Sequence, residues 1–69
     1  MDEEALNISI RKFLKKLGIK AQREMEQAII VSLKQGKLNG NETLAAKARV
    51  SLEGTDVDFT IAEQITLAK

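Results

Sequence analysis

The stretch from Leu44 to Ile61 reads LAAKARVSLEGTDVDFTI. Apolar and polar residues alternate up to Leu52 and again from Val57, which is the two-residue period of a half-buried strand. Gly54-Thr55 separates the two runs, and glycine suits the first central position of a type II′ turn. The stretch therefore predicts an antiparallel β-hairpin with strands at about 43–53 and 56–67.

The position of this turn fixes the register of the predicted hairpin. Val50 falls opposite Phe59, so apolar residues meet apolar residues on one face. On the other face Arg49 lies diagonal to Asp58, a favourable pairing of opposite charges. Residues 62–69 either extend the second strand or bend into a short third strand. The Ala-Glu-Gln sequence at the start of this segment is poor turn chemistry, which favours the long hairpin.

Residues upstream of the hairpin have the apolar spacing of amphipathic helices. A first helix is predicted at about 3–17, where apolar residues recur at i, i+4, i+7, i+8 and i+11. Gly18 is expected to end it in a left-handed conformation. A second helix follows at about 21–35, with Gly36 as its terminator. Lys20 stands where a capping Ser, Thr, Asp or Asn is usual, so Gly18 is the main mark of this boundary.

These elements predict an α+β fold of order α-α-β-β, with both helices packed on one face of the antiparallel hairpin. A chain of 69 residues has room for one core, so a single domain covering 1–69 is expected. Three exposed apolar residues exceed what two such helices need to bury, and they are candidate contacts with a partner: Ile8, Ile30 and Val31.

The composition argues against enzymatic chemistry. The chain has no cysteine and no histidine, so disulfides and ordinary zinc, haem or iron–sulfur sites are excluded. Its serines have no histidine to act as their base, and the carboxylates around the hairpin turn lack the spacing of a calcium loop. We therefore predict no catalytic, cofactor-binding or metal-binding residues. A core this small usually needs extra support, and self-association is the form left open.

Three of the first four residues are acidic where a signal peptide is basic, and no apolar run approaches the roughly 18 residues of a membrane span. The absence of cysteine also fits a reducing compartment. These features predict a cytoplasmic protein.

The formal net charge is only +1, yet basic residues gather in the helical half. This basic cluster consists of Arg11, Lys12, Lys15, Lys16, Lys20 and Arg23, and it is a candidate contact for an anion or a nucleic acid. No aromatic residue lies on its face to stack a base, which favours a solvated surface. A helix-turn-helix is disfavoured, because the apolar face at Met25 and Ala28 is rotated by one residue from what that motif buries.

The run from Asn7 to Lys16, NISIRKFLKK, resembles the opening of a family of short bacterial proteins known only as a domain of unknown function. Gln22-Arg23-Glu24, Gly36-Lys37-Leu38 and the segment from Gly40 to Leu44 share this resemblance, which covers roughly the first 44 residues. It implies a small, freestanding bacterial protein of the cytosol. No activity is assigned to that family, so the resemblance carries over no functional residue.

The sequence thus leaves the biological function unknown and predicts its class. We expect a non-enzymatic interaction module that acts through self-association, as a homodimer, or through a protein partner. Weak nucleic-acid binding through the basic face of the first helix is the alternative. An enzyme would require a site completed across subunits.

Overall fold

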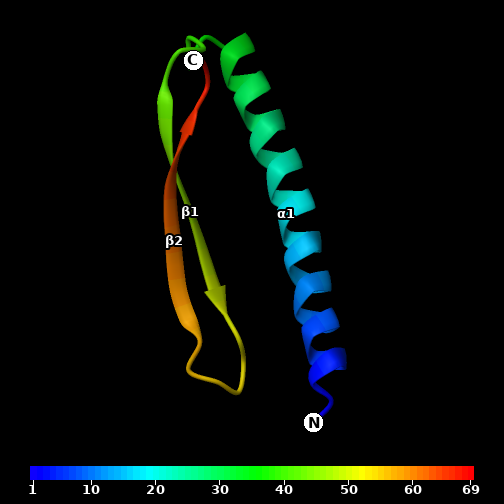
Figure 1. Ribbon diagram of the computed structural model, residues 1–69. Helices are drawn as coiled ribbons and strands as arrows, with labels where there is room; N and C mark the ends of the chain where they lie inside the picture. The colour runs from blue at the N-terminus through cyan, green and yellow to red at the C-terminus, as the bar shows by residue number, and fades with distance from the viewer. The chain divides into compact units, whose positions relative to one another are not determined.

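The computed structural model describes residues 1–69, which form one helix and one β-hairpin (Figure 1). Helix α1 spans Glu3–Lys34, and strands β1 (Thr43–Ser51) and β2 (Asp58–Thr66) form a two-stranded sheet. The chain divides into two units, Met1–Lys37 and Leu38–Lys69. The α+β class with an antiparallel hairpin is confirmed. The prediction of two N-terminal helices is wrong, because a single helix covers both predicted segments.

Helix α1 passes through Gly18 without a break. Gly18 is not among the glycines with positive φ, and a Cβ built on it would meet no atom within 4 Å. A second helix starting near Lys20 would leave its first N–H groups without acceptors, because lysine cannot cap them. Continuing the helix pairs each of them with a carbonyl four residues back, at a cost of about 1 kcal/mol for one internal glycine.

The true ends of α1 carry the capping chemistry that Gly18 lacks. Asp2 is the N-cap, and its Oδ1 accepts hydrogen bonds from the N–H groups of Glu4 at 3.0 Å and Ala5 at 3.1 Å. At the other end Gly36 has φ of 77°, and the N–H of Lys37 donates to the carbonyl of Ser32 at 2.9 Å. This is a Schellman motif, so the predicted terminator at Gly36 is confirmed.

The hairpin has the predicted register along its whole length. Val50 pairs with Phe59, and at the far end Thr43 pairs with Thr66. Strand β2 therefore continues through residues 62–66, which confirms the long hairpin over a third strand. The strands end at Ser51 and resume at Asp58, two residues short of the predicted bounds on each side of the turn.

The turn itself differs from the predicted two-residue loop. The N–H of Thr55 donates to the carbonyl of Leu52 at 3.2 Å, which makes Gly54 the second central residue, with φ of 84°. The Thr55 hydroxyl donates to the same carbonyl at 2.7 Å and accepts from the N–H of Val57 at 3.1 Å. These bonds widen the connection but leave the register unchanged, since the N–H of Leu52 still donates to the carbonyl of Val57 at 3.1 Å.

The Glu42 carboxylate organises the segment that leads into β1. It accepts hydrogen bonds from three successive N–H groups, those of Asn39 at 2.8 Å, Gly40 at 2.9 Å and Asn41 at 3.2 Å. Gly40 has φ of 100°, which helps its N–H turn toward the same acceptor as its neighbours. These bonds, led by the one from Asn39, hold the pKa of Glu42 below its ordinary value.

This lowered pKa predicts a pH-dependent hairpin. A carboxyl whose pKa is depressed on folding stabilises the folded state above its unfolded pKa, and this stabilisation is lost as the pH falls through the folded value. We expect Glu42→Gln to melt at a lower temperature than the wild type at pH 7, and the difference to shrink below about pH 4. Thermal unfolding followed by circular dichroism from pH 2 to pH 7 measures it.

Glu53→Gln is the matched control, because Glu53 lies in the loop at the opposite end of the hairpin. It should leave the pH dependence of the melting temperature unchanged. Equal pH profiles for Glu42→Gln and the wild type would show that the charge of the Glu42 carboxylate contributes nothing to folding.

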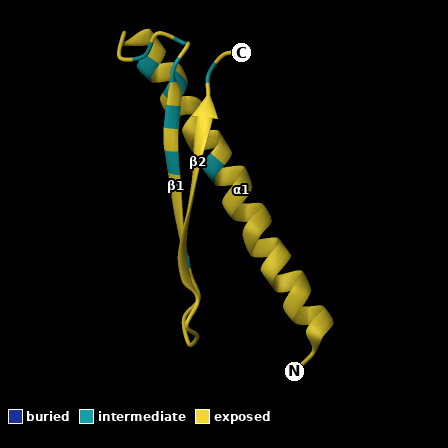
Figure 2. Cartoon of the chain, turned by 60° about the vertical axis from the view of Figure 1, so that its left-hand side comes forward, coloured by how far each residue is buried: buried dark blue, intermediate teal, exposed yellow.

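No residue in the chain is buried, as Figure 2 shows. A lone helix encloses no interior, and a two-stranded sheet has no second layer of its own. Large apolar side chains consequently remain open to solvent, among them Phe13 at 56% and Phe59 at 47% of their full exposure. Each unit therefore presents apolar surface that its own residues cannot cover. The single domain over 1–69 stays a prediction.

Candidate partner-binding surface

The basic cluster lies on one continuous helix, and α1 brings all six of its members to one side. Two grooves run along this side. The first, of about 370 Å³, is lined by Ile8, Arg11, Lys12 and Lys15. The second, of about 530 Å³, is lined by Lys12, Lys15, Lys16, Ile19, Lys20 and Arg23. A break at Gly18 would have separated Lys20 and Arg23 from the other four.

The cations from Arg11 to Lys16 have no carboxylate within six residues in the sequence, whereas Lys20 and Arg23 are followed by Glu24 and Glu26. Residues 5–23 contain all six and neither aspartate nor glutamate. Arg11 makes a long hydrogen bond of 3.4 Å from Nη1 to the Asn7 Oδ1, and no member of the cluster forms an ion pair. The positive charge of this side is therefore free to meet an anionic partner.

Ile8, Ile19 and Ile30 are spaced eleven residues apart, and we call them the isoleucine row. Eleven residues at about 100° each return to within about 20° of the starting direction, so the three lie along one side of α1. They are 56%, 50% and 45% exposed. Ile8 and Ile19 lie in the two basic grooves, whereas Glu26 interrupts the row before Ile30.

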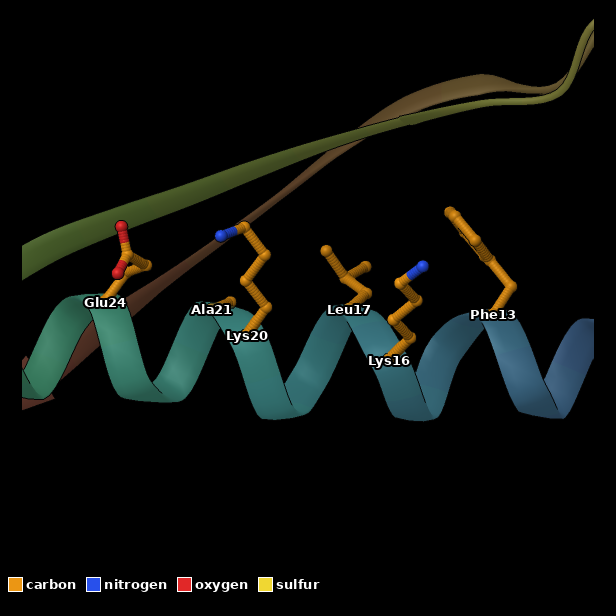
Figure 3. A pocket seen from close by; sticks show the side chains of 6 residues that line it. All are labelled: Phe13, Lys16, Leu17, Lys20, Ala21 and Glu24. Carbon is orange, nitrogen blue, oxygen red and sulfur yellow. The ribbon is translucent and has the colours of Figure 1, made fainter.

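The opposite side of α1 carries a second apolar surface, the main apolar face. It consists of Leu6, Ile10, Phe13, Leu14, Leu17, Ala21, Met25, Ala28 and Val31. A groove of about 410 Å³ in it is lined by Phe13, Lys16, Leu17, Lys20, Ala21 and Glu24. Figure 3 shows these six side chains rising from one side of the helix. Lys16 and Lys20 line this groove and the second basic groove, so they mark the border between the two sides.

The three predicted partner contacts do not form one patch. Ile8 and Ile30 belong to the isoleucine row, while Val31 lies about 100° away on the main apolar face. Ile19 is the member of the row that sequence reasoning missed, because a helix end at Gly18 leaves Ile19 outside both predicted helices. The eleven-residue spacing of the isoleucines was the signal that could have identified it.

The polar face of the hairpin holds the one ion pair of the chain. Arg49 contacts Asp58 through two parallel bonds, Nε to Oδ1 at 2.9 Å and Nη2 to Oδ2 at 2.7 Å, as the predicted register implied. The pair lowers the pKa of the Asp58 carboxyl and raises the pKa of the guanidinium. No group of three acidic side chains lies close enough to hold a metal ion.

No helix of the chain combines the length and the apolar composition that a membrane crossing needs.

Comparison with known proteins places the chain in a family. No curated protein and no solved structure matches it. A family model described as a family of unknown function (DUF6494) matches residues 1–68. The match extends through the hairpin, well beyond the first 44 residues that carry the resemblance in the sequence. The chain belongs to this family.

Proposed function

We propose that the chain is a non-enzymatic interaction module of the bacterial cytoplasm, which acts through self-association or through a protein partner. One observation carries this proposal: the chain has three apolar faces. Two lie on opposite sides of α1, and the third is the hairpin face that contains Val50 and Phe59. An apolar face is buried when it packs against another apolar face. If two of the three faces pack together within the chain, the third is left for another molecule.

The main apolar face is where we place self-association. It is the longest of the three, running from Leu6 to Val31, and its groove around Leu17 is almost wholly apolar at its floor. A twofold dimer buries the same face of both copies, so each apolar side chain of this face contributes its burial twice per dimer. Exposed side chains such as Phe13 and Leu14, at 56% and 49%, supply the area to be buried.

Nucleic-acid binding through the basic cluster is the second candidate. It is supported by the six cations without a carboxylate between residues 5 and 23. Such binding would weaken steeply with salt and would be lost for every sequence alike when Lys12, Lys15 and Lys16 are changed to Glu. Binding through apolar side chains would instead tolerate salt.

Sedimentation velocity of the full chain from low to high micromolar concentration tests the proposal. We expect the average mass to rise above that of one chain, or a protein to co-purify with it from its native cell after nuclease treatment. A well-folded monomer at high micromolar concentration that retains no protein would contradict the proposal. Salt-sensitive retention of RNA or DNA alone would favour the second candidate.

A further inference from the structure

The basic side of α1 between Ile8 and Arg23 combines two chemistries. Ile8 and Ile19 keep about half of their surface exposed, and each lies in a groove walled by lysine and arginine side chains. The aliphatic stems of those side chains add apolar area around the isoleucines, while their charged ends reach outward. A ligand that fills these grooves must offer apolar groups flanked by negative charge.

We propose that this side of α1 binds an acidic, amphipathic helical segment of another protein. The apolar residues of that segment contact Ile8 and Ile19, and its carboxylates pair with the basic cluster. The inference rests on the proposed function and names the chemistry of the partner. Such a partner would complement the charge of this segment, because residues 5–23 contain six cations and no acidic residue.

A second copy of the chain does not fit this surface. Two copies facing each other here would bring two sets of six cations together, and like charges across an interface cost several kcal/mol. Self-association therefore belongs to the main apolar face, whose groove is almost wholly apolar and is bordered by Glu24 as well as by Lys16 and Lys20. The two sides of α1 are suited to different partners.

A nucleic acid fits less well than an acidic protein segment. Phosphates would pair with the cations but would leave Ile8 and Ile19 facing a charged backbone. Bases would need aromatic side chains to stack on, and the two aromatics of the chain lie elsewhere, Phe13 on the main apolar face and Phe59 in β2.

The spacing of the isoleucines indicates the form of the partner. Eleven residues of helix advance about 16 Å, so Ile8 and Ile19 are two contact points in a line parallel to the axis of α1. A second helix lying alongside, with apolar residues at three- and four-residue intervals, meets both points and places acidic residues on either flank.

Binding of synthetic peptides to the full chain tests the inference at physiological ionic strength. The probe is a fluorescent helical peptide of about 22 residues, two eleven-residue repeats, built from Leu, Ala and Glu with the leucines on one face. A scrambled peptide of the same composition keeps the charge and loses the apolar face. Single-stranded oligouridylate is the third probe. Fluorescence anisotropy gives the three dissociation constants.

We expect the patterned peptide to bind about tenfold more tightly than the scrambled one. Ile19→Ser should remove that preference, and Lys15→Glu with Lys16→Glu should abolish binding of both peptides. Serine and isoleucine have similar helix propensities, so Ile19→Ser leaves α1 intact. Val31→Ser is the matched control on the main apolar face, and it should leave peptide binding unchanged.

Equal affinities for the two peptides, or tighter binding of oligouridylate that ignores Ile19→Ser, would overturn the inference. So would the absence of peptide binding. Sedimentation of the same samples separates the two proposals. Self-association without peptide binding refutes only the acidic partner. The absence of both self-association and peptide binding refutes the interaction module as well.

Discussion

Gly18→Pro is expected to destabilise α1 by about 3 kcal/mol or more. Proline at this position removes one N–H from the middle of the helix, and its ring clashes with the carbonyl of Leu14, four residues earlier. Residues on the two sides of position 18 would then form separate, short helices, which are marginal in water. Circular dichroism should record a large loss of helical signal, and thermal unfolding a lower midpoint.

Gly18→Ala and Gly36→Ala are the controls, and their effects should have opposite signs. Alanine at Gly18 meets no neighbouring atom and should stabilise the helix by about 1 kcal/mol. Alanine at Gly36 must adopt φ near 77° and should destabilise its end by a similar amount. A destabilising Gly18→Ala would show that the chain breaks at Gly18 after all.

Leu17→Asp is expected to weaken self-association by at least about a hundredfold. Leu17 lies at the centre of the groove in the main apolar face, beside Phe13 and Ala21. Burial of a leucine contributes about 1.5–3 kcal/mol, and a twofold dimer contains two copies of it. A buried unpaired carboxylate in its place adds a further penalty. Sedimentation at a concentration where the wild type is assembled measures the change.

Gln22→Asp is the matched control for this variant. It introduces the same side chain into the interior of the same helix, with a similar loss of helix propensity, but outside the main apolar face. Its assembly should match the wild type. If Leu17→Asp and Gln22→Asp assemble equally well, the main apolar face is not the self-association surface.

The hairpin was predictable because its determinants are local. Alternation indicates which residues share a face. Pairing Val50 with Phe59 places apolar residues opposite each other on one face and Arg49 near Asp58 on the other. The predicted register is therefore right although the predicted turn is wrong. The turn was harder because its geometry depends on the Thr55 hydroxyl, which bonds to both sides of the loop. Several turns can close one register, and alternation does not distinguish them.

The break predicted at Gly18 is wrong because a glycine in the sequence does not by itself end a helix. Glycine marks a C-cap only when the chain adopts positive φ there, and Gly18 and Gly36 look alike in the sequence. The lysine at position 20, where a capping residue was missing, was the better evidence. The same error hid Ile19 from the candidate contacts, whereas the basic cluster was listed from residue types alone, and its role as a contact stays a prediction.

The bonds around Glu42 could not be predicted from the sequence. Three N–H groups converge on one carboxylate only when Asn39, Gly40 and Asn41 take a particular set of backbone angles. Asparagine and glycine tolerate positive φ, and Gly40 has φ of 100°. The acceptor is Glu42, the residue just before β1. No rule of sequence spacing identifies its carboxylate as the group that holds this connection.

If a second copy of the chain covers the main apolar face, the thermal unfolding of the chain must depend on its concentration. Binding to the folded state raises the unfolding midpoint as the concentration of the bound species increases. We predict that the midpoint of the purified chain, followed by circular dichroism, rises with its own concentration across the micromolar range. A sharp, cooperative transition at the same temperature at every concentration would contradict self-association through the main apolar face, because the folded chain would then gain no stability from a second copy.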